Sequence, residues 1–191
     1  MFIIQTETLG FDSNAAILSV GIYYSGDNEK IDYNGPIAHD PENICYVKFD
    51  VKEQVKHYNR TINKDTVSWW KSQSEEVKKH SFIPSISDMT VIEGYEKLKS
   101  FVKQKSSNRY DFVWSRGYIT PVCLESLFRS AIQPSLFKPN CYRELRTAID
   151  ILKGSADNGY CKINNYEVNK EQRHIPHYNV INEWAMLIYG N

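Results

Sequence analysis

Short apolar runs bounded by polar residues dominate the first quarter of the chain and predict β-strands. The expected strands cover residues 2–6, 16–24 and 45–49, where β-branched and aromatic side chains are common, as they are in strands generally. A turn signal, Gly26-Asp27-Asn28, follows the second run. Three strands in succession predict an antiparallel meander.

Beyond these strands the apolar residues recur every three or four positions, which indicates amphipathic helices. Asp65 is a suitable N-cap and Pro121 suits a first helical turn. The expected helices cover residues 66–79, 91–103, 122–131, 141–152 and 179–189. In the second of them the shared face would carry Ile92, Tyr95, Leu98 and Phe101. With a further strand at 110–114, this order predicts an α/β fold, a mixed sheet flanked by helices, in one domain of residues 1–191.

Composition and charge narrow the function classes. Of the 191 residues 41% are apolar and 24% charged, and the formal net charge is zero, so a general phosphate-binding surface is not expected and any nucleic-acid contact must be local. The four cysteines lack CxxC spacing and read as free thiols of a reducing compartment. With no signal peptide or long apolar span, the sequence predicts a cytoplasmic protein without membrane contact.

Five segments follow one another in an order that is fairly specific as a set. They are FIIQTETLG, TVSWWKSQSEE, VWSRG, RELRT and HIPHYNVINEWAML. Together they resemble the DEDDh class of 3′–5′ exonucleases in the ribonuclease H-like superfamily, in particular the T4-type phage exonuclease A and similar small bacterial exoribonucleases. The resemblance implies a ribonuclease H-like fold over nearly the whole chain.

The resemblance also implies a catalytic site, which this sequence retains only in part. Members use four carboxylates to hold two divalent metals and a histidine as general base. When the family's catalytic positions are carried over to this sequence, Glu7 and His174 match as the catalytic pair. The resemblance implies that this pair is vestigial in this chain. The residues at or near the other acidic positions are Gln5, Thr120, Pro121 and Asn179.

A single carboxylate cannot balance the charge of two divalent ions in a low-dielectric cleft. The expectation is therefore no cofactor, or at most one weakly bound Mg²⁺ or Mn²⁺ at Glu7. The alternative is a relocated acidic ligand, for which the candidates are Asp12, Asp111 and Glu125.

Aromatic and basic residues supply the candidates for nucleic-acid binding. Of the adjacent Trp69 and Trp70, one should pack in the core while the other is exposed to stack on a base or to anchor a partner. The basic candidates near the cleft are Arg116, Arg143 and Arg146, the last two expected on one helix face. Ion pairing of these arginines with Glu144 or Asp150 is the alternative.

Three functions remain open from the sequence. The favoured one is a catalytically degenerate exonuclease homologue, a pseudoenzyme, which binds a partner protein, single-stranded nucleic acid or a nucleotide. The resemblance suggests a phage protein with an accessory or counter-defence role. One alternative is an active metal-dependent 3′–5′ exonuclease with a noncanonical site, and the other is a structural protein that forms homo-oligomers.

Overall fold

The fold is seen in a computed structural model that describes residues 1–26, 40–106, 111–155, 157–164, 166 and 172–191. Within these residues a single sheet has the strand order β3-β2-β1-β4-β5. The strands are β1 (Phe2–Thr8), β2 (Ile17–Tyr24), β3 (Ile44–Lys48), β4 (Val113–Ser115) and β5 (Tyr142–Glu144). β1, β2 and β3 form the predicted antiparallel meander, whereas β4 pairs in parallel with both β1 and β5. The mixed α/β architecture is confirmed.

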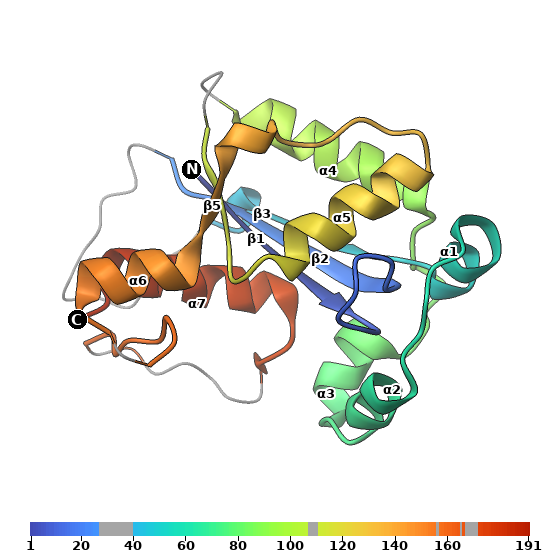
Figure 1. The fold of residues 1–191 in the computed structure, drawn as a ribbon, viewed down its shortest axis with the longest axis horizontal. Helices are drawn as coiled ribbons and strands as arrows, with labels where there is room; N and C mark the ends of the chain where they lie inside the picture. Colours follow the sequence, from blue (N-terminus) through green and yellow to red (C-terminus); the bar gives the residue numbers. More distant parts are fainter. Residues whose placement is uncertain (27–39, 107–110, 156, 165, 167–171) are drawn as a thin grey trace.

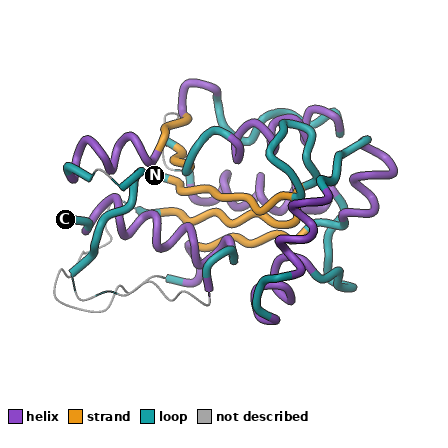
Figure 2. The backbone as a smooth tube through the Cα atoms, turned by 60° about the horizontal axis from the view of Figure 1, so that its bottom comes forward, coloured by secondary structure: helices purple, strands orange, loops and turns teal. Residues whose placement is uncertain are grey.

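Helices cover both faces of the sheet (Figures 1 and 2). One face is packed against α4 (Val91–Lys105) and α5 (Ile119–Ser130), and the other against α7 (Pro176–Tyr189), beside which lies α6 (Leu145–Lys153). At one end of the sheet lie α1 (Val51–Tyr58), α2 (Lys64–Lys71), α3 (Glu75–Val77) and the π-helical turn η2 (Lys78–Phe82). Two 3₁₀ turns, η1 (Pro41–Asn43) and η3 (Pro139–Cys141), precede β3 and β5. No helix in the described ranges is long and apolar enough to cross a membrane.

The central strand β1 separates the two layers by the alternation of its side chains. Phe2 and Ile4 belong to the core under α4 and α5. Ile3 instead packs with Val180 and Trp184 of α7. Continuing this alternation, Gln5 and Glu7 face the α7 side, and Thr6 faces α5.

Several predicted boundaries change. The helix expected at 66–79 is split, because α2 ends at Lys71 and Ser74 caps a separate short helix. Asn63, not Asp65, caps α2, since its Oδ1 accepts the N–H groups of Asp65 at 2.9 Å and Thr66 at 3.0 Å. The helix α1, capped by Asp50, was not predicted.

The segment predicted as one helix at 141–152 is a strand followed by a helix. Residues Tyr142–Glu144 pair in parallel with β4, and Glu144 then caps α6 through the N–H groups of Arg146 and Thr147. Arg143 therefore lies on β5 and Arg146 on α6, so the prediction that they share a helix face is wrong. Ile92 was also misassigned, because it is exposed while Tyr95, Leu98 and Phe101 are buried.

The other predicted elements are present with shifted ends. Pro176 is the first residue of α7, so this helix begins three residues before the predicted 179. α5 begins at Ile119, ahead of the expected 122, with Pro121 in its first turn. β4 begins at Val113, and part of the predicted strand 110–114 and of the turn 26–28 lies outside the described residues. All four cysteines are free thiols.

Close contact between β2 and the start of α7 depends on Gly21. A Cβ at this position would lie 2.6 Å from the carbonyl carbon of Pro176, a backbone atom that cannot swing away. We expect Gly21→Ala to lower the free energy of unfolding by about 2 kcal/mol, as overpacked sites do, measured by urea denaturation. Gly26→Ala is the matched control, since its Cβ would meet nothing nearer than a Tyr24 ring atom at 3.6 Å. Equal effects of the two substitutions would contradict this account.

Candidate functional site

Residues from the two ends of the sequence meet at the end of β1. The Nδ1 atom of His174 lies 3.6 Å from Oε1 of Glu7, and Nδ2 of Asn179 donates to the same oxygen at 3.4 Å. β1 supplies the carboxylate, the loop before α7 supplies the imidazole, and the first turns of α7 supply the amide. The structure thus brings together Glu7, His174 and Asn179, three residues that the family resemblance placed at or near the site.

His174 is held in place by its backbone and by its neighbours. Its φ of 69° is in the left-handed region, which is uncommon for a residue with a side chain. Its carbonyl accepts a hydrogen bond from Ser81 Oγ at 2.9 Å, and its ring meets the Trp69 ring edge-on with centroids 4.8 Å apart. These contacts from η2 and α2 point the imidazole at Glu7.

The other residues predicted at or near acidic positions of the family divide between the two faces of the sheet. Gln5 shares the face of Glu7, and its Oε1 is buried without a hydrogen-bond partner among the residues that the structure describes. Thr120 lies on the opposite face, where its Oγ1 accepts from the backbone N–H of Thr6 at 3.3 Å and pairs with the Thr6 hydroxyl at 3.1 Å. Pro121 follows it in the first turn of α5 and has no polar side-chain atom.

The side chains at this site do not fit a two-metal centre. The cluster of Gln5, Glu7 and Asn179 contains one carboxylate, and the neighbouring carboxylate of Glu183 is already paired with Arg116. Two divalent hard cations need more negative charge than that. Among the described residues, no three His, Cys, Asp or Glu side chains are placed to hold a metal ion.

The three acidic residues considered as substitutes make their hydrogen bonds elsewhere. Asp12 accepts from the backbone N–H of Asn14, Asp111 from the Ser106 hydroxyl, and Glu125 from the Tyr142 hydroxyl. None of them lines either of the two cavities beside Glu7 and His174.

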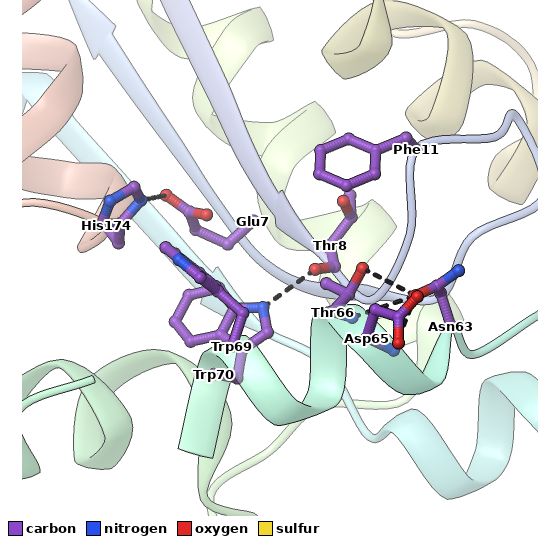
Figure 3. A pocket seen from close by; sticks show the side chains of 9 residues that line it. All are labelled: Glu7, Thr8, Phe11, Asn63, Asp65, Thr66, Trp69, Trp70 and His174. Atoms are coloured by element: carbon purple, nitrogen blue, oxygen red, sulfur yellow. Dashed lines mark hydrogen bonds and ion pairs between the residues drawn. The ribbon is translucent and has the colours of Figure 1, made fainter. Parts of the chain in front are cut away.

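An aromatic cavity of about 590 Å³ opens beside Glu7 and His174 (Figure 3). Its other lining residues are Thr8, Phe11, Asn63, Asp65, Thr66, Trp69 and Trp70. Trp70 is buried and donates Nε1–H to the Thr8 carbonyl at 3.0 Å, whereas Trp69 is 41% exposed and Phe11 81% exposed. The prediction of one core and one exposed tryptophan is confirmed, and the exposed one lies in the cavity.

A second cavity of about 300 Å³ adjoins the first at His174, which lines both. Its walls include Gln5, Asn179 and a buried ion pair between Arg116 Nε and Glu183 Oε1, 3.1 Å apart. Arg116 also donates to the carbonyl of Gly159 at 2.9 Å, so this predicted phosphate contact is already engaged within the protein. Burial raises the pKa of Glu183 to about 7, although the Arg116 guanidinium opposes the rise.

Sequence reasoning missed Glu183. The available signal was its position in the final helix, four residues after Asn179 and next to the buried Trp184, where an acidic side chain is out of place unless it is paired.

Arg143 and Arg146 line neither cavity. The Arg143 guanidinium stacks over the Phe112 ring at 4.1 Å and donates to the Asn140 carbonyl at 2.8 Å. The Arg146 side chain packs against Gly159. Glu144 and Asp150 were considered as ion-pair partners of these arginines. Glu144 instead accepts the backbone N–H of Thr147, and Asp150 accepts that of Gly159 at 2.7 Å.

Fold and site together define an exonuclease-like protein of the α/β class. The model of the Rv2179c-like 3′-5′ exoribonuclease domain family matches residues 1–178, and the chain belongs to this family. It is also similar to an exodeoxyribonuclease of Enterobacteria phage T4, with 29% identity over 119 residues. That match covers 61% of this chain but spans only about half of the relative, 49% of its length.

The buried ion pair between Arg116 and Glu183 makes the stability of the protein depend on pH. The pKa of Glu183 is raised to about 7 in the folded protein. The protonated carboxyl group therefore stabilises the fold fully when the pH is below the ordinary pKa of a glutamate, and this stabilisation is lost as the pH rises through 7. The charged groups that act on Glu183 are Arg116, Arg146 and Glu7. Arg116→Met should therefore cost about 3 kcal/mol of unfolding free energy at pH 8, and less at pH 5.5, where Glu183 is protonated.

Urea denaturation at both pH values measures this difference. Arg129→Met, on an exposed part of α5, is the control and should change stability by less than about 0.5 kcal/mol. The double variant Arg116→Met/Glu183→Met should recover most of the loss, because it removes the uncompensated charge. A loss that is the same at both pH values would refute the assignment.

Proposed function

We propose that this family member binds the end of a single-stranded nucleic acid in the cleft between β1, α2 and α7 without hydrolysing it. The observation that carries the proposal is the charge of the Gln5-Glu7-Asn179 cluster. Its single carboxylate accepts from the Asn179 amide at 3.4 Å and lies 3.6 Å from His174. A centre that clamps both the attacking and the leaving oxygen needs two divalent ions, and this cluster lacks the negative charge to hold them.

The neutral substitutions are consistent with a site kept for binding. Clustered carboxylates repel one another and raise each other's pKa values, so replacing them with amides relieves an electrostatic cost to the fold. Asn179 and Gln5 retain polar oxygen and nitrogen atoms that can contact a ligand. At most one weakly bound Mg²⁺ or Mn²⁺ at Glu7 is compatible with this donor set.

The aromatic cavity favours nucleic-acid bases as the ligand. Trp69 presents an exposed ring beside Glu7 and His174, and Phe11 presents one on the other side of the same cavity, beyond Thr8 (Figure 3). Base stacking on such rings stabilises single-stranded complexes without a strong sequence preference. Stacking also suits a chain of zero net charge, which lacks a general surface for phosphates. The names of the matched family and of the T4 relative refer to RNA and DNA chains.

The wider biological role is a further part of the proposal. Similarity to a phage T4 protein motivates an origin in phage. The proposed accessory or counter-defence role in the cytoplasm is motivated by the missing carboxylates together with this similarity. A protein partner is the main competing ligand, since an exposed tryptophan can also anchor a protein interface.

The test is one incubation of the protein with 3′-labelled single-stranded RNA and DNA, with Mg²⁺ or Mn²⁺, read for both degradation and retarded mobility. We expect the protein to retain the labelled strands, seen as retarded mobility, without releasing mononucleotides from them. Trp69→Ala should weaken retention about tenfold, the effect of losing one base stack.

Phe112→Ala is the matched control, because Phe112 is similarly exposed but lies beside Phe2 at the far end of β1. Degradation that disappears in Glu7→Ala would instead establish the active, noncanonical exonuclease. If the protein neither degrades nor retains the oligonucleotides, nucleic acid is excluded as the ligand. A protein partner or self-association then remains.

A further inference from the structure

We infer that a third cavity, beside the edge strand β3, binds phosphate groups. This basic cavity has a volume of about 490 Å³ and shares no lining residue with the two cavities that meet at His174. The polar side chains on which the inference rests are Lys48, Lys79, His80, Ser85, Ser87 and Lys97. Among the described residues, no Asp or Glu side chain lines the cavity.

Two ammonium groups of the basic cavity have no counter-charge. Lys48 is balanced, since its Nζ lies 3.4 Å from Oδ1 of Asp88, which lines an adjoining cavity and not this one. Lys79 and Lys97 are exposed, and within the described ranges neither forms an ion pair. Because lysine is ordinarily protonated at neutral pH, the cavity carries an excess of about two positive charges.

Hydroxyl groups add to the donors of the basic cavity. Ser85 and Ser87 are exposed, and their Oγ atoms lie 3.0 Å apart. A hydrogen bond between two hydroxyls uses one of their two hydrogens, so the other can be donated to a ligand. Phosphate has several acceptor oxygens and a negative charge, and it can accept from ammonium and hydroxyl groups at the same time. This lining therefore suits a phosphate better than a neutral or cationic ligand.

The turn η2 connects the basic cavity with the aromatic cavity. Lys79 of this turn lines the basic cavity. Ser81 of the same turn donates to the His174 carbonyl at 2.9 Å. Phe82 stacks on the Trp70 ring with centroids 6.0 Å apart. A strand that leaves the aromatic cavity across η2 would therefore bring its backbone phosphates to the exposed lysines.

The backbone of the bound strand is one source of phosphate, and as a site for it the basic cavity rests on the proposed function. The chain has zero net charge, so its contacts with phosphates must be concentrated locally. Arg116, a predicted phosphate contact, is already engaged by Glu183 and the Gly159 carbonyl. A free polyphosphate offers the same chemistry and needs no strand in the aromatic cavity.

Proton NMR of the full chain with inorganic tripolyphosphate tests the phosphate site without any base. His80 lines the cavity and is the reporter, its ring signals being identified by their loss in His80→Gln. These signals should shift saturably. The signals of His57, which is exposed on α1 outside the cavity, should move little and serve as the internal reference.

Removal of the two unpaired charges should abolish most of this binding. Lys79→Gln/Lys97→Gln should weaken tripolyphosphate binding at least about tenfold, because contacts to charged groups are lost. Lys103→Gln/Lys138→Gln is the matched control, since it removes the same charge from two exposed lysines outside the cavity. It should change the affinity by less than about twofold, as exposed charges contribute little at a distance.

Retention of a labelled single strand at several salt concentrations identifies the source of the phosphate. For single strands, log K falls with log salt with a slope of about 0.7 for each phosphate contact. If the strand is the ligand, Lys79→Gln/Lys97→Gln should reduce this slope by about 1.4, and the control pair by less than about half of that. A slope equal to that of the control would assign the cavity to a free polyphosphate.

The inference would be overturned if tripolyphosphate shifted the His80 signals no more than those of His57. The same holds if the lysine pair of the cavity and the control pair behaved alike with tripolyphosphate. Tighter binding of tetra-aspartate than of tripolyphosphate would also overturn it and would indicate an acidic segment of a protein partner.

The proposed function is judged separately by strand retention that depends on Trp69, which does not line the basic cavity. If the protein retains no strand while tripolyphosphate binds at His80, the proposed function fails and the phosphate site stands. If strand retention depends on Trp69 while tripolyphosphate leaves His80 unchanged, the phosphate site fails and the proposed function stands.

Discussion

The alternation of side chains along β1 is the constraint on which the site depends. A strand sends successive residues to opposite faces of its sheet, so Ile3, Gln5 and Glu7 face α7 while Phe2, Ile4 and Thr6 face α4 and α5. Ile3 secures α7 by apolar packing with Val180 and Trp184. The same helix then carries Asn179 to Glu7. A shift of one residue in the pairing of β1 and β2 would turn the side chains of Gln5 and Glu7 into the core on the opposite face of the sheet.

A buried charge pair holds the other side of the site together. Arg116 follows β4, Glu183 lies on α7, and the guanidinium also reaches the backbone carbonyl of Gly159. Breaking such a pair is costly because one charge stays in a low-dielectric interior, although an apolar replacement of both partners is often tolerated. The pair is therefore poor evidence of high stability. It does fix the end of β4 relative to α7, and with it the wall of the second cavity.

The sequence was sufficient for features that depend on local pattern. The meander, the helix α4 and the contrast between Trp69 and Trp70 follow from alternation and helical spacing. Segment 141–152 was misread because its apolar spacing suits a helix, whereas pairing with β4 makes Tyr142–Glu144 a strand. Glu183 was missed because its role depends on Arg116, a partner 67 positions away in the sequence. Thr120 was predicted near an acidic position of the family, and the structure shows that it lies in the first turn of α5 and bonds to Thr6 on the face of the sheet opposite Glu7.

The geometry of Glu7 and His174 also bears on the function of the site. Glu7 and His174 are oriented toward each other, and the left-handed backbone of His174 is a local cost that its contacts with Ser81 and Trp69 offset. A site without function would be expected to relax such a conformation. Both cavities meet at this histidine. Under the proposed function, this geometry fits a role of His174 in dividing and shaping the binding site, which needs the position of the imidazole and not its basicity.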